Sequence, residues 1–401
     1  MTGEGLRLSH SIRWRREYFG VFAWTVDRGE FFRIEGLDAA VLGVIALSGD
    51  IARQALYPSV LSDAGFAASP EAIQESANRL LHAGLLVRTG HAAGAHSGVG
   101  SRYLESAPAE SVAKPVWVHL QPFTFCNLSC IHCYCDSSPQ APRFRRSPED
   151  WCKAIAAFDD YGIADVYLTG GETLIVPEVW TLVREISARK MGTGLSTNAL
   201  HVSPGIIDNL QRFEIRTIQV SLDGGTAKTH DWLRNKRGAF EQTLRNIEAI
   251  AKVSEPVINT TVNRANLSEL REIVRLGQAL GVRKFKFYPQ KATGRAALLQ
   301  DLTLSDAEIV ESLRPLCASI ARETNTRVET VDPAARCGSA WSGFSVDALG
   351  DAFPCIFGIG APSQRAGNVF DQDIDDVWFQ SPVMRRFRTQ DESPCRRCEF
   401  G

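Results

Sequence analysis

Short apolar runs and longer amphipathic stretches alternate along the chain from about residue 114 onward. Strand-like runs fall near residues 117–121, 165–169, 193–196, 215–222, 257–263 and 283–288. Helices are predicted to begin between them, at Ser147, near Pro177, near Pro204, near Phe240 and at Asn266. Strands that alternate with helices in this rhythm indicate an α/β fold with a parallel sheet and right-handed crossovers. The six units are too few to close an eight-stranded barrel.

The first 88 residues follow a different pattern. Strand-like pieces lie at 12–15, 19–26 and 30–34. Asp38 is then predicted to cap an apolar helix through Leu47, and Ser69-Pro70 combines a Ser N-cap with a Pro in the first turn. A short strand, or wing, is predicted at 85–87. Strands, helices and a wing predict a winged-helix-like domain over residues 1–88.

Two further segments complete the division of the chain. Residues 89–113 contain few large apolar side chains and much Gly, Ala, Ser and His, which predicts a flexible linker. Its His91 and His96 are interpreted as solvated, with weak metal ligation as the alternative. Residues 304–401 follow the last strand–helix unit and are expected to form a small α+β domain.

The cysteines are the first candidate functional residues, and the chain has ten of them. Cys126, Cys130 and Cys133 form a C-x3-C-x2-C run. Thiolates are the ligands of iron–sulfur clusters, and three of them leave one iron of a cubane open. The alternatives are a zinc knuckle, which normally presents C-x2-C pairs, or chance spacing. Because the N-terminus lacks the apolar core of a signal peptide, thiolates are favoured over disulfides.

This run resembles the signature of radical S-adenosylmethionine (SAM) enzymes, whose open iron chelates the amino and carboxylate groups of SAM. Other segments resemble further motifs of that family in the same order. The resemblance implies that the SAM amino group is bound at Gly-Gly-Glu, the ribose near the end of the next strand, and the carboxylate by a Ser and an Arg. The residues at these positions are Gly170, Gly171, Glu172, Ser196, Asn198, Ser221 and Arg234.

The fold implied by the resemblance is an open, partial (β/α)6 TIM barrel over residues 114–303, with its chemistry at the C-terminal ends of the strands. The glycines are expected to let the backbone approach the ligand. His132 is expected to pack near the adenine. No catalytic side chain is assigned beyond the cluster and SAM. Cys135 is interpreted as a bystander, with cluster ligation as the alternative.

A second set of cysteines lies near the C-terminus. Cys337 and Cys355 stand in a C-x12-G-x4-C pattern, and Cys395 and Cys398 form a C-x2-C pair. Four thiolates can hold a second cubane or a structural zinc. The pattern resembles the SPASM and twitch extensions of radical SAM enzymes. A full SPASM domain has further cysteines, so a twitch-type domain with one auxiliary cluster is expected, for a total of two [4Fe-4S] clusters.

The implied enzyme cleaves SAM reductively, and the resulting 5′-deoxyadenosyl radical takes hydrogen from the substrate. The architecture of residues 1–88 resembles the PqqD-like precursor-recognition domain of peptide maturases. The expected partners are therefore a ribosomally made precursor peptide, bound through its leader, and an electron donor such as flavodoxin or ferredoxin. The favoured product is a carbon–carbon, ether or thioether cross-link.

Alternatives to this function remain open at the level of sequence. They are a radical SAM dehydrogenase or dehydratase acting on a small molecule such as an aminoglycoside, a peptide epimerase, and a regulator whose winged helix binds DNA. The 44 basic and 46 acidic residues give no polyelectrolyte character, so no nucleic-acid partner is expected. No apolar run approaches the ~20 residues of a membrane span. A cytoplasmic enzyme without a membrane partner is the expectation.

Overall fold

The computed structural model describes residues 5–9, 12–17, 20–25, 31–48, 51–52, 55–56, 58–60, 68–89, 114–213, 215–331 and 338–388. They belong to two compact units, Met1–Ala113 and Lys114–Gly401, each described by itself below. The predicted linker with His91 and His96, except for its first residue, lies outside the described residues. So do Cys337, Cys395 and Cys398.

The N-terminal unit contains two small sheets. Strands β2 (Ile12–Glu17), β3 (Gly20–Thr25) and β4 (Phe31–Glu35) form an antiparallel meander in that order, which confirms the predicted strands. The second sheet has the order β5-β1-β6, with β1 (Gly5–Leu8) between β5 (Ile51–Ala52) and β6 (Leu86–Thr89). The sequence did not indicate β1, because its four residues are too few to show a period.

Among the described residues, helices α1 (Gly36–Ser48) and α3 (Pro70–His82) cover the core of this unit. Ser69 caps α3 as predicted, since its hydroxyl accepts a hydrogen bond of 3.2 Å from the Ala72 N–H. Helix α1 begins two residues earlier than predicted, at Gly36, whose φ of 57° suits a glycine. Asp38 therefore lies in the first turn instead of capping the helix, and it forms an ion pair of 2.6 Å with Arg79 of α3.

The second unit is built on one open sheet. Its order is β13 (Arg327–Thr330), β12 (Lys284–Pro289), β11 (Pro256–Val262), β10 (Thr217–Ser221), β9 (Gly192–Thr197), β8 (Asp165–Leu168), β7 (Trp117–Leu120), β14 (Gly343–Val346), β15 (Asp351–Phe353) and β16 (Gly367–Asn368). Neighbouring strands from β13 to β14 are parallel, and the last two pairs are antiparallel. The predicted strands from β7 to β12 are all present.

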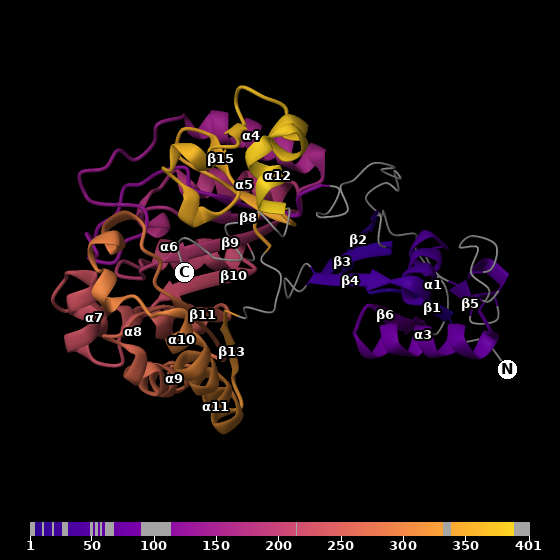
Figure 1. Cartoon of the computed structure of the whole chain (residues 1–401), viewed down its shortest axis with the longest axis horizontal. Helices are drawn as coiled ribbons and strands as arrows, with labels where there is room; N and C mark the ends of the chain where they lie inside the picture. The colour runs from indigo at the N-terminus through magenta and orange to yellow at the C-terminus, as the bar shows by residue number, and fades with distance from the viewer. Residues whose placement is uncertain are drawn as a thin grey trace. The chain divides into compact units, whose positions relative to one another are not determined.

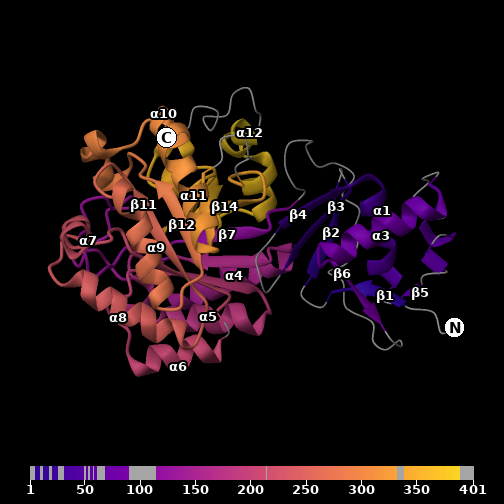
Figure 2. The ribbon, with the colours of Figure 1, turned by 90° about the horizontal axis from the view of Figure 1, so that it is seen from below.

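Helices connect these strands and bury their apolar residues against the sheet. They are α4 (Pro148–Tyr161), α5 (Val179–Ala188), α6 (Pro204–Arg212), α7 (Ala227–Arg234), α8 (Ala239–Ala251) and α9 (Leu270–Ala279). Figure 1 shows them around the strands, and Figure 2 shows α5, α6 and α8 along one side of the sheet. The helix predicted at Asn266 begins as a 3-10 turn, Leu267–Glu269, because the Asn266 amide bonds to the carbonyls of Asp223 and Thr261, both at 2.9 Å.

The C-terminal region does not build a sheet of its own. Strand β14 pairs in parallel with β7, and Ser345 lies opposite His119 in that register. Helices α10 (Asp306–Glu308), α11 (Arg314–Thr324) and α12 (Pro382–Arg388) accompany these strands. The buried Arg388 ties α12 in place through bonds of 2.8 Å to the Ala340 carbonyl and 2.6 Å to the Trp378 carbonyl. Among the described residues, the region expected as a separate α+β domain thus extends the sheet of the barrel.

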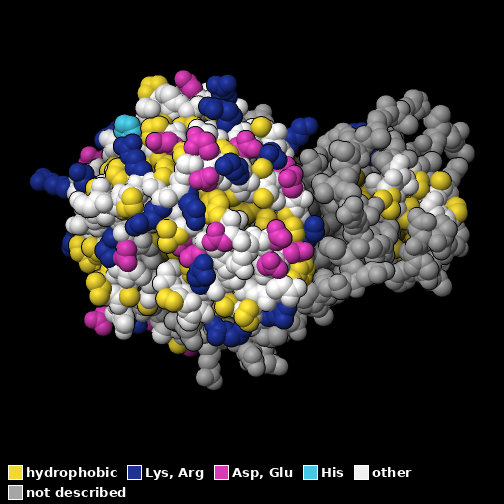
Figure 3. Space-filling model, turned by 90° about the horizontal axis from the view of Figure 1, so that it is seen from above, with side chains coloured by type: hydrophobic (Ala, Val, Ile, Leu, Met, Phe, Trp, Pro, Cys, Tyr) yellow, Lys and Arg dark blue, Asp and Glu magenta, His cyan; other side chains and the backbone are white. Residues whose placement is uncertain are grey.

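The surface gives little sign of a large field of one charge. On the face in Figure 3, Lys and Arg side chains are interspersed with Asp and Glu. None of the described helices is long and apolar enough to cross a bilayer.

Candidate active site

The loop that carries Cys126, Cys130 and Cys133 follows β7 and is held by backbone hydrogen bonds. The Cys126 N–H donates to the Ser138 carbonyl at 3.1 Å, and the Ile131 N–H donates to the Leu233 carbonyl at 3.0 Å. Cys126 and Cys130 are each 8% exposed. The first bond closes the loop on itself, and the second anchors it to the end of α7. The three thiols predicted as cluster ligands therefore lie in one anchored loop.

Hydrogen-bond donors surround two of these sulfur atoms. The Leu128 N–H lies 3.4 Å from Cys126 Sγ, and Asn198 Nδ2 lies 3.8 Å from the same atom. Arg234 Nη1 lies 3.8 Å from Cys130 Sγ. Such donors stabilise negative charge on sulfur and tune a bound cluster. The donor set fits a thiolate-ligated iron–sulfur cluster.

Burial affects the protonation of two of these thiols. Burial raises the pKa of Cys126 to about 12 and also raises that of Cys130. These thiols are protonated at neutral pH unless a metal displaces the proton, so cluster loading releases protons. Among the described residues, no three His, Cys, Asp or Glu side chains converge to hold one metal ion. A cubane has no such requirement, because each thiolate ligates a different iron.

The two glycines of Gly-Gly-Glu are required by the cysteine loop. A Cβ at Gly170, which has a φ of 115°, would lie 2.3 Å from the Phe123 carbonyl oxygen. A Cβ at Gly171 would lie 1.8 Å from the Phe125 oxygen. The expected close approach of the backbone to a ligand is thus seen as a close approach to the loop that carries the cysteines.

Glu172 is buried and joins the ends of β8 and β9. Its carboxylate accepts hydrogen bonds from Thr197 Oγ1 at 2.5 Å, the Asn198 N–H at 2.6 Å and the Leu174 N–H at 3.0 Å. Burial raises the pKa of Glu172, and these bonds oppose the rise. A carboxylate has about four acceptor sites, so about one stays available for an ammonium group. The predicted contact with the SAM amino group remains a prediction, with little spare capacity on the carboxylate.

Asp223 is the centre of a buried charged cluster at the end of β10. Its Oδ2 lies 2.6 Å from Arg234 Nη2 and 2.9 Å from His132 Nε2, and its Oδ1 accepts the Thr261 N–H at 3.0 Å. Asp223 is 0% and Arg234 9% exposed. Desolvation opposes ionisation of Asp223, but the Arg234 guanidinium and the His132 ring hold its pKa well below the usual range. The cluster therefore holds a carboxylate and a guanidinium as a buried ion pair.

This cluster gives Arg234 and His132 partners within the protein. Arg234 bridges Asp223 and Cys130, and its Nε makes no hydrogen bond within the described residues, so its contact with the SAM carboxylate stays a prediction. The His132 ring contacts Asp223 and, at 3.1 Å, the Leu233 carbonyl, and its place near the adenine also stays a prediction. His132 thus fastens the cysteine loop to β10 and α7.

The remaining predicted SAM contacts lie on neighbouring strand ends. Ser196, at the end of β9, stands opposite Gln219 in the register, and Ser221, at the end of β10, stands opposite Asn259. The Asn198 amide donates to Asn127 Oδ1 at 2.8 Å, so this side chain also supports the cysteine loop. The sheet brings these residues to one edge, and their contacts with SAM stay predictions.

Sequence reasoning missed Gln121, which follows β7 directly. It is 1% exposed, and neither its Oε1 nor its Nε2 has a hydrogen-bond partner within the described residues. An unpaired buried amide is costly and marks a position where a ligand can complete the bonding. The sequence did contain a feature that could have identified Gln121 as a site residue, because it is a polar residue at the end of an apolar strand.

The other cysteines occupy different surroundings. Cys135 Sγ lies 3.8 Å from Cys133 Sγ and 3.1 Å from Ser137 Oγ, so its thiol already has polar neighbours. Cys317 is 2% exposed and belongs to the core. Cys355 precedes a 3-10 helix whose Phe357 packs edge-on against Tyr134, with ring centroids 5.6 Å apart. The described part of the auxiliary segment therefore touches the cysteine loop.

Comparison with known proteins defines the class. Residues 120–277 match the radical SAM superfamily, and residues 337–399 match the SPASM iron–sulfur cluster-binding domain. The first domain binds SAM and a [4Fe-4S] cluster, and the second binds auxiliary iron–sulfur clusters, which confirms the predicted cofactors. The chain thus carries a radical SAM domain followed by a SPASM-type domain.

The chain is also similar to individual proteins of known name and to solved structures. It is 29% identical to the AdoMet-dependent heme synthase of Methanosarcina barkeri over 69% of this chain and 86% of the relative. It is 28% identical to the mycofactocin maturase MftC of Mycobacterium ulcerans over 68% and 77%. The crystal structure of Streptococcus suis SuiB bound to S-adenosylmethionine superposes with a TM-score of 0.69 at 17% identity, over 96% of this chain and 90% of that one. The last likeness confirms the predicted fold class.

The division of labour in the site follows from these contacts. When bound, SAM and its cluster supply a 5′-deoxyadenosyl radical after one-electron reduction. The chain's own residues bury and anchor the thiolates, aim N–H groups at the sulfurs, and hold Arg234 in one orientation through Asp223. These are positioning functions.

His230 makes the site sensitive to acid. Burial and the nearby Arg234 charge lower its pKa to about 3, and its Nδ1 accepts the Asp223 N–H at 3.1 Å. Below about pH 6.5 the unfolded state binds a proton that the folded state does not. The free energy of unfolding is therefore expected to fall by about 1.4 kcal/mol per pH unit on this account as the pH drops toward 3.

Calorimetric melting between pH 4.5 and 7.5 checks this expectation. His230→Gln is expected to flatten the decline of Tm with falling pH, and His201→Gln, at an exposed position, to leave the slope unchanged. Equal slopes for the His230 variant and the native protein would contradict the assignment.

Proposed function

We propose that this protein is a peptide maturase, which takes hydrogen from a ribosomally synthesised precursor peptide and installs a carbon–carbon, ether or thioether cross-link. The observation that carries the proposal is the N-terminal unit. In the described part of the chain it adds small antiparallel sheets and the helices α1 and α3 to the radical SAM and SPASM domains, and the likeness to SuiB covers 96% of the chain. SuiB has also been solved with its precursor peptide SuiA.

The meander β2-β3-β4 supports a role in leader recognition. Its outer strands, β2 and β4, pair on one side only within the described residues. An extended peptide can add to such an edge, where main-chain hydrogen bonds supply affinity and alternate side chains supply selectivity. The unit is, on this proposal, a PqqD-like recognition domain for the leader.

The auxiliary site suits a net oxidation. Cross-linking removes two hydrogens from the peptide: the radical takes one as a hydrogen atom, and the other leaves as a proton and an electron. A cluster held by Cys337, Cys355, Cys395 and Cys398 is the proposed acceptor of that electron. Because four cysteines fill a cubane, we assign it electron transfer, without ligation of the peptide.

A second candidate rests on the relatives named heme synthase, which are 28–29% identical over 69% of this chain. Their alignments leave about a third of the chain unmatched, whereas the likeness to SuiB covers nearly all of it. This difference favours the peptide. Epimerisation of a peptide and oxidation of a small molecule such as an aminoglycoside remain the other outcomes.

Coexpression with short peptides encoded beside the gene, followed by mass spectrometry, tests the proposal. The expected result is a loss of two hydrogens per cross-link, localised by fragmentation to two residues of the core peptide. An unchanged mass with exchange of one Cα hydrogen in deuterated solvent would indicate epimerisation. Turnover of a tetrapyrrole with no effect on any peptide would overturn the peptide proposal.

Removal of residues 1–113 separates recognition from chemistry. Because the two units are compact on their own, the remaining chain is expected to keep reductive SAM cleavage within about twofold. Modification of the full precursor is expected to fall by about a hundredfold, since the leader no longer raises the local concentration of the core peptide. Unchanged precursor turnover by the truncated enzyme would show that the N-terminal unit has no recognition role.

A further inference from the structure

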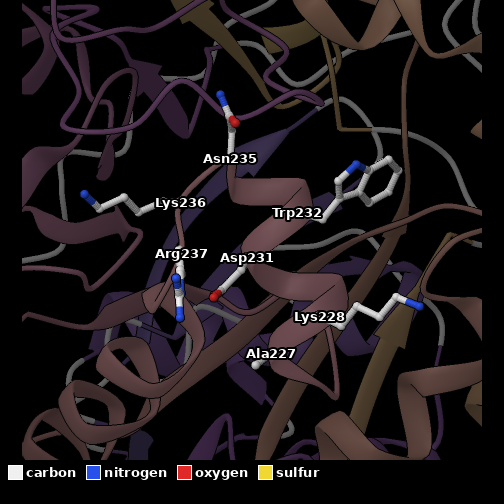
Figure 4. A pocket seen from close by; sticks show the side chains of 7 residues that line it. All are labelled: Ala227, Lys228, Asp231, Trp232, Asn235, Lys236 and Arg237. Carbon is white, nitrogen blue, oxygen red and sulfur yellow. The ribbon is translucent and has the colours of Figure 1, made fainter.

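Helix α7 carries an exposed depression on its outer side. Figure 4 shows the side chains that line it, which come from α7 and the turn that follows: Ala227, Lys228, Asp231, Trp232, Asn235, Lys236 and Arg237. Trp232 is 48% exposed. A tryptophan so open to solvent is uncommon in a folded domain, and Trp is enriched where proteins meet.

The depression is positively charged. Lys228, Lys236 and Arg237 are exposed, and none of them is paired with a carboxylate in the described part of the chain. The single acidic residue of the lining, Asp231, is already engaged: its two oxygens accept the Gly238 and Phe240 N–H groups at 2.6 and 2.8 Å. We call Lys228, Trp232, Lys236 and Arg237 the α7 patch.

The same helix and the turn that follows it also contact the cysteine loop. The Leu233 carbonyl accepts the Ile131 N–H at 3.0 Å, Arg234 Nη1 lies 3.8 Å from Cys130 Sγ, and Asn235 Nδ2 donates to the Ser129 carbonyl at 3.5 Å. A helix with its side chains is about 10–12 Å across. The patch therefore lies roughly one helix diameter from a sulfur atom that would ligate the cluster.

We propose that the α7 patch docks an acidic one-electron carrier protein of the flavodoxin or ferredoxin type. The proposal rests on the reductive SAM cleavage included in the proposed function, and it is independent of the peptide. On transfer, the carrier loses one electron and the cluster gains it, with no bond formed or broken in either protein. Unpaired cations attract the acidic partner and speed encounter, and the exposed Trp232 supplies an apolar anchor.

The test compares two charge-reversed variants of the full-length, cluster-loaded enzyme. One carries Lys228→Glu, Lys236→Glu and Arg237→Glu. The matched control carries Lys153→Glu, Arg184→Glu and Lys190→Glu, three exposed cations on or after α4 and α5, and has the same change in net charge. The probe is a purified flavodoxin, with dithionite as the small-molecule reductant.

For the patch variant we expect flavodoxin affinity to weaken by about tenfold or more at low salt, because each exposed charge contributes modestly and three are reversed. The difference should shrink as salt rises, because exposed charges are screened. Formation of 5′-deoxyadenosine driven by flavodoxin should fall in parallel, and that driven by dithionite should stay unchanged. The control variant should resemble the native enzyme in all three assays.

Several results would overturn the proposal. Equal flavodoxin binding by the patch and control variants is one. Normal flavodoxin binding with loss of precursor-peptide binding is another, since the patch would then serve an acidic peptide. A milder variant with Gln at the three positions controls for misfolding of the Glu variant. If both the Glu and the Gln variants lose dithionite-driven SAM cleavage, the patch residues are needed for folding and not for docking. No SAM cleavage by the native enzyme with dithionite would refute the proposed function instead.

Discussion

Replacing Cys126, Cys130 and Cys133 together by Ala is expected to abolish 5′-deoxyadenosine formation. The reason is that no other thiols lie in the anchored loop at the positions where Leu128, Asn198 and Arg234 present donors to sulfur. The cofactors carry the difficult chemistry, so an enzyme without the first cluster has no residual route to the radical.

Iron analysis of the same variant separates the two metal sites. The native protein, purified anaerobically, is expected to hold about eight irons and eight sulfides per chain, and the variant about four. Cys152→Ala is the matched control, because this half-buried thiol on α4 lies outside both cysteine sets. Stoichiometric zinc with half the native iron would turn the second site into a structural zinc site. Undiminished SAM cleavage by the triple variant would refute the ligand assignment.

Removal of the Asp223 carboxylate is expected to cause the largest loss of stability by a single substitution. Asp223→Ala leaves the Arg234 guanidinium buried without its counter-charge and frees the His132 ring and the Thr261 N–H. Breaking a buried ion pair from one side costs about 3–5 kcal/mol. Asp208→Ala, at an exposed position of α6, is expected to change stability by less than about 0.5 kcal/mol.

A double-mutant cycle shows whether the cost comes from the orphaned charge. Asp223→Ala combined with Arg234→Met removes both charges, and the pair is expected to be less destabilised than the sum of the single variants by about 1–3 kcal/mol. Chemical denaturation of the apo proteins measures this. Additive effects would show that Asp223 acts through Thr261 and the backbone, and not through Arg234.

The same variants test what Arg234 does for SAM. If Asp223 orients Arg234, then Asp223→Ala should weaken SAM binding nearly as much as Arg234→Ala, although no direct contact between Asp223 and SAM is proposed. Equilibrium dialysis with labelled SAM measures this on the cluster-loaded enzyme. Normal SAM affinity in the Asp223 variant would confine the cluster of charges to a structural role.

Local signals were predictable because they depend on a few neighbouring residues. Ser147 and Ser203 cap α4 and α6 by accepting hydrogen bonds of 3.1 Å from the Asp150 N–H and 3.3 Å from the Ile206 N–H, and each helix begins with the proline that follows its cap. Gly162 ends α4 with a φ of 100°. Periods of two and 3.6 residues then separate strands from helices.

Roles within the site were less predictable, because one side chain can have several partners. The sequence marked Glu172 and Arg234 as charges for SAM, and the structure shows both already bound to protein groups. His132 lies two residues from Cys130, but its partner Asp223 lies just after β10, and nothing in the local pattern indicates that pairing. Gln121 was visible only as the polar end of a strand until its unpaired, buried amide was seen.

The sequence by itself determined the order of strands and helices from β7 to α9, the parallel sheet, and the loop that groups Cys126, Cys130 and Cys133. These depend on periodicity, capping and spacing, which act over a few residues. Only the tertiary structure decided that β14 joins β7, where Trp117 Nε1 donates to Ser342 Oγ across 225 positions, and that Asp223 unites His132 with Arg234. Buried polar groups need hydrogen-bond partners, and in these cases the partners are distant in sequence. Which groups become partners depends on the packing of the complete core.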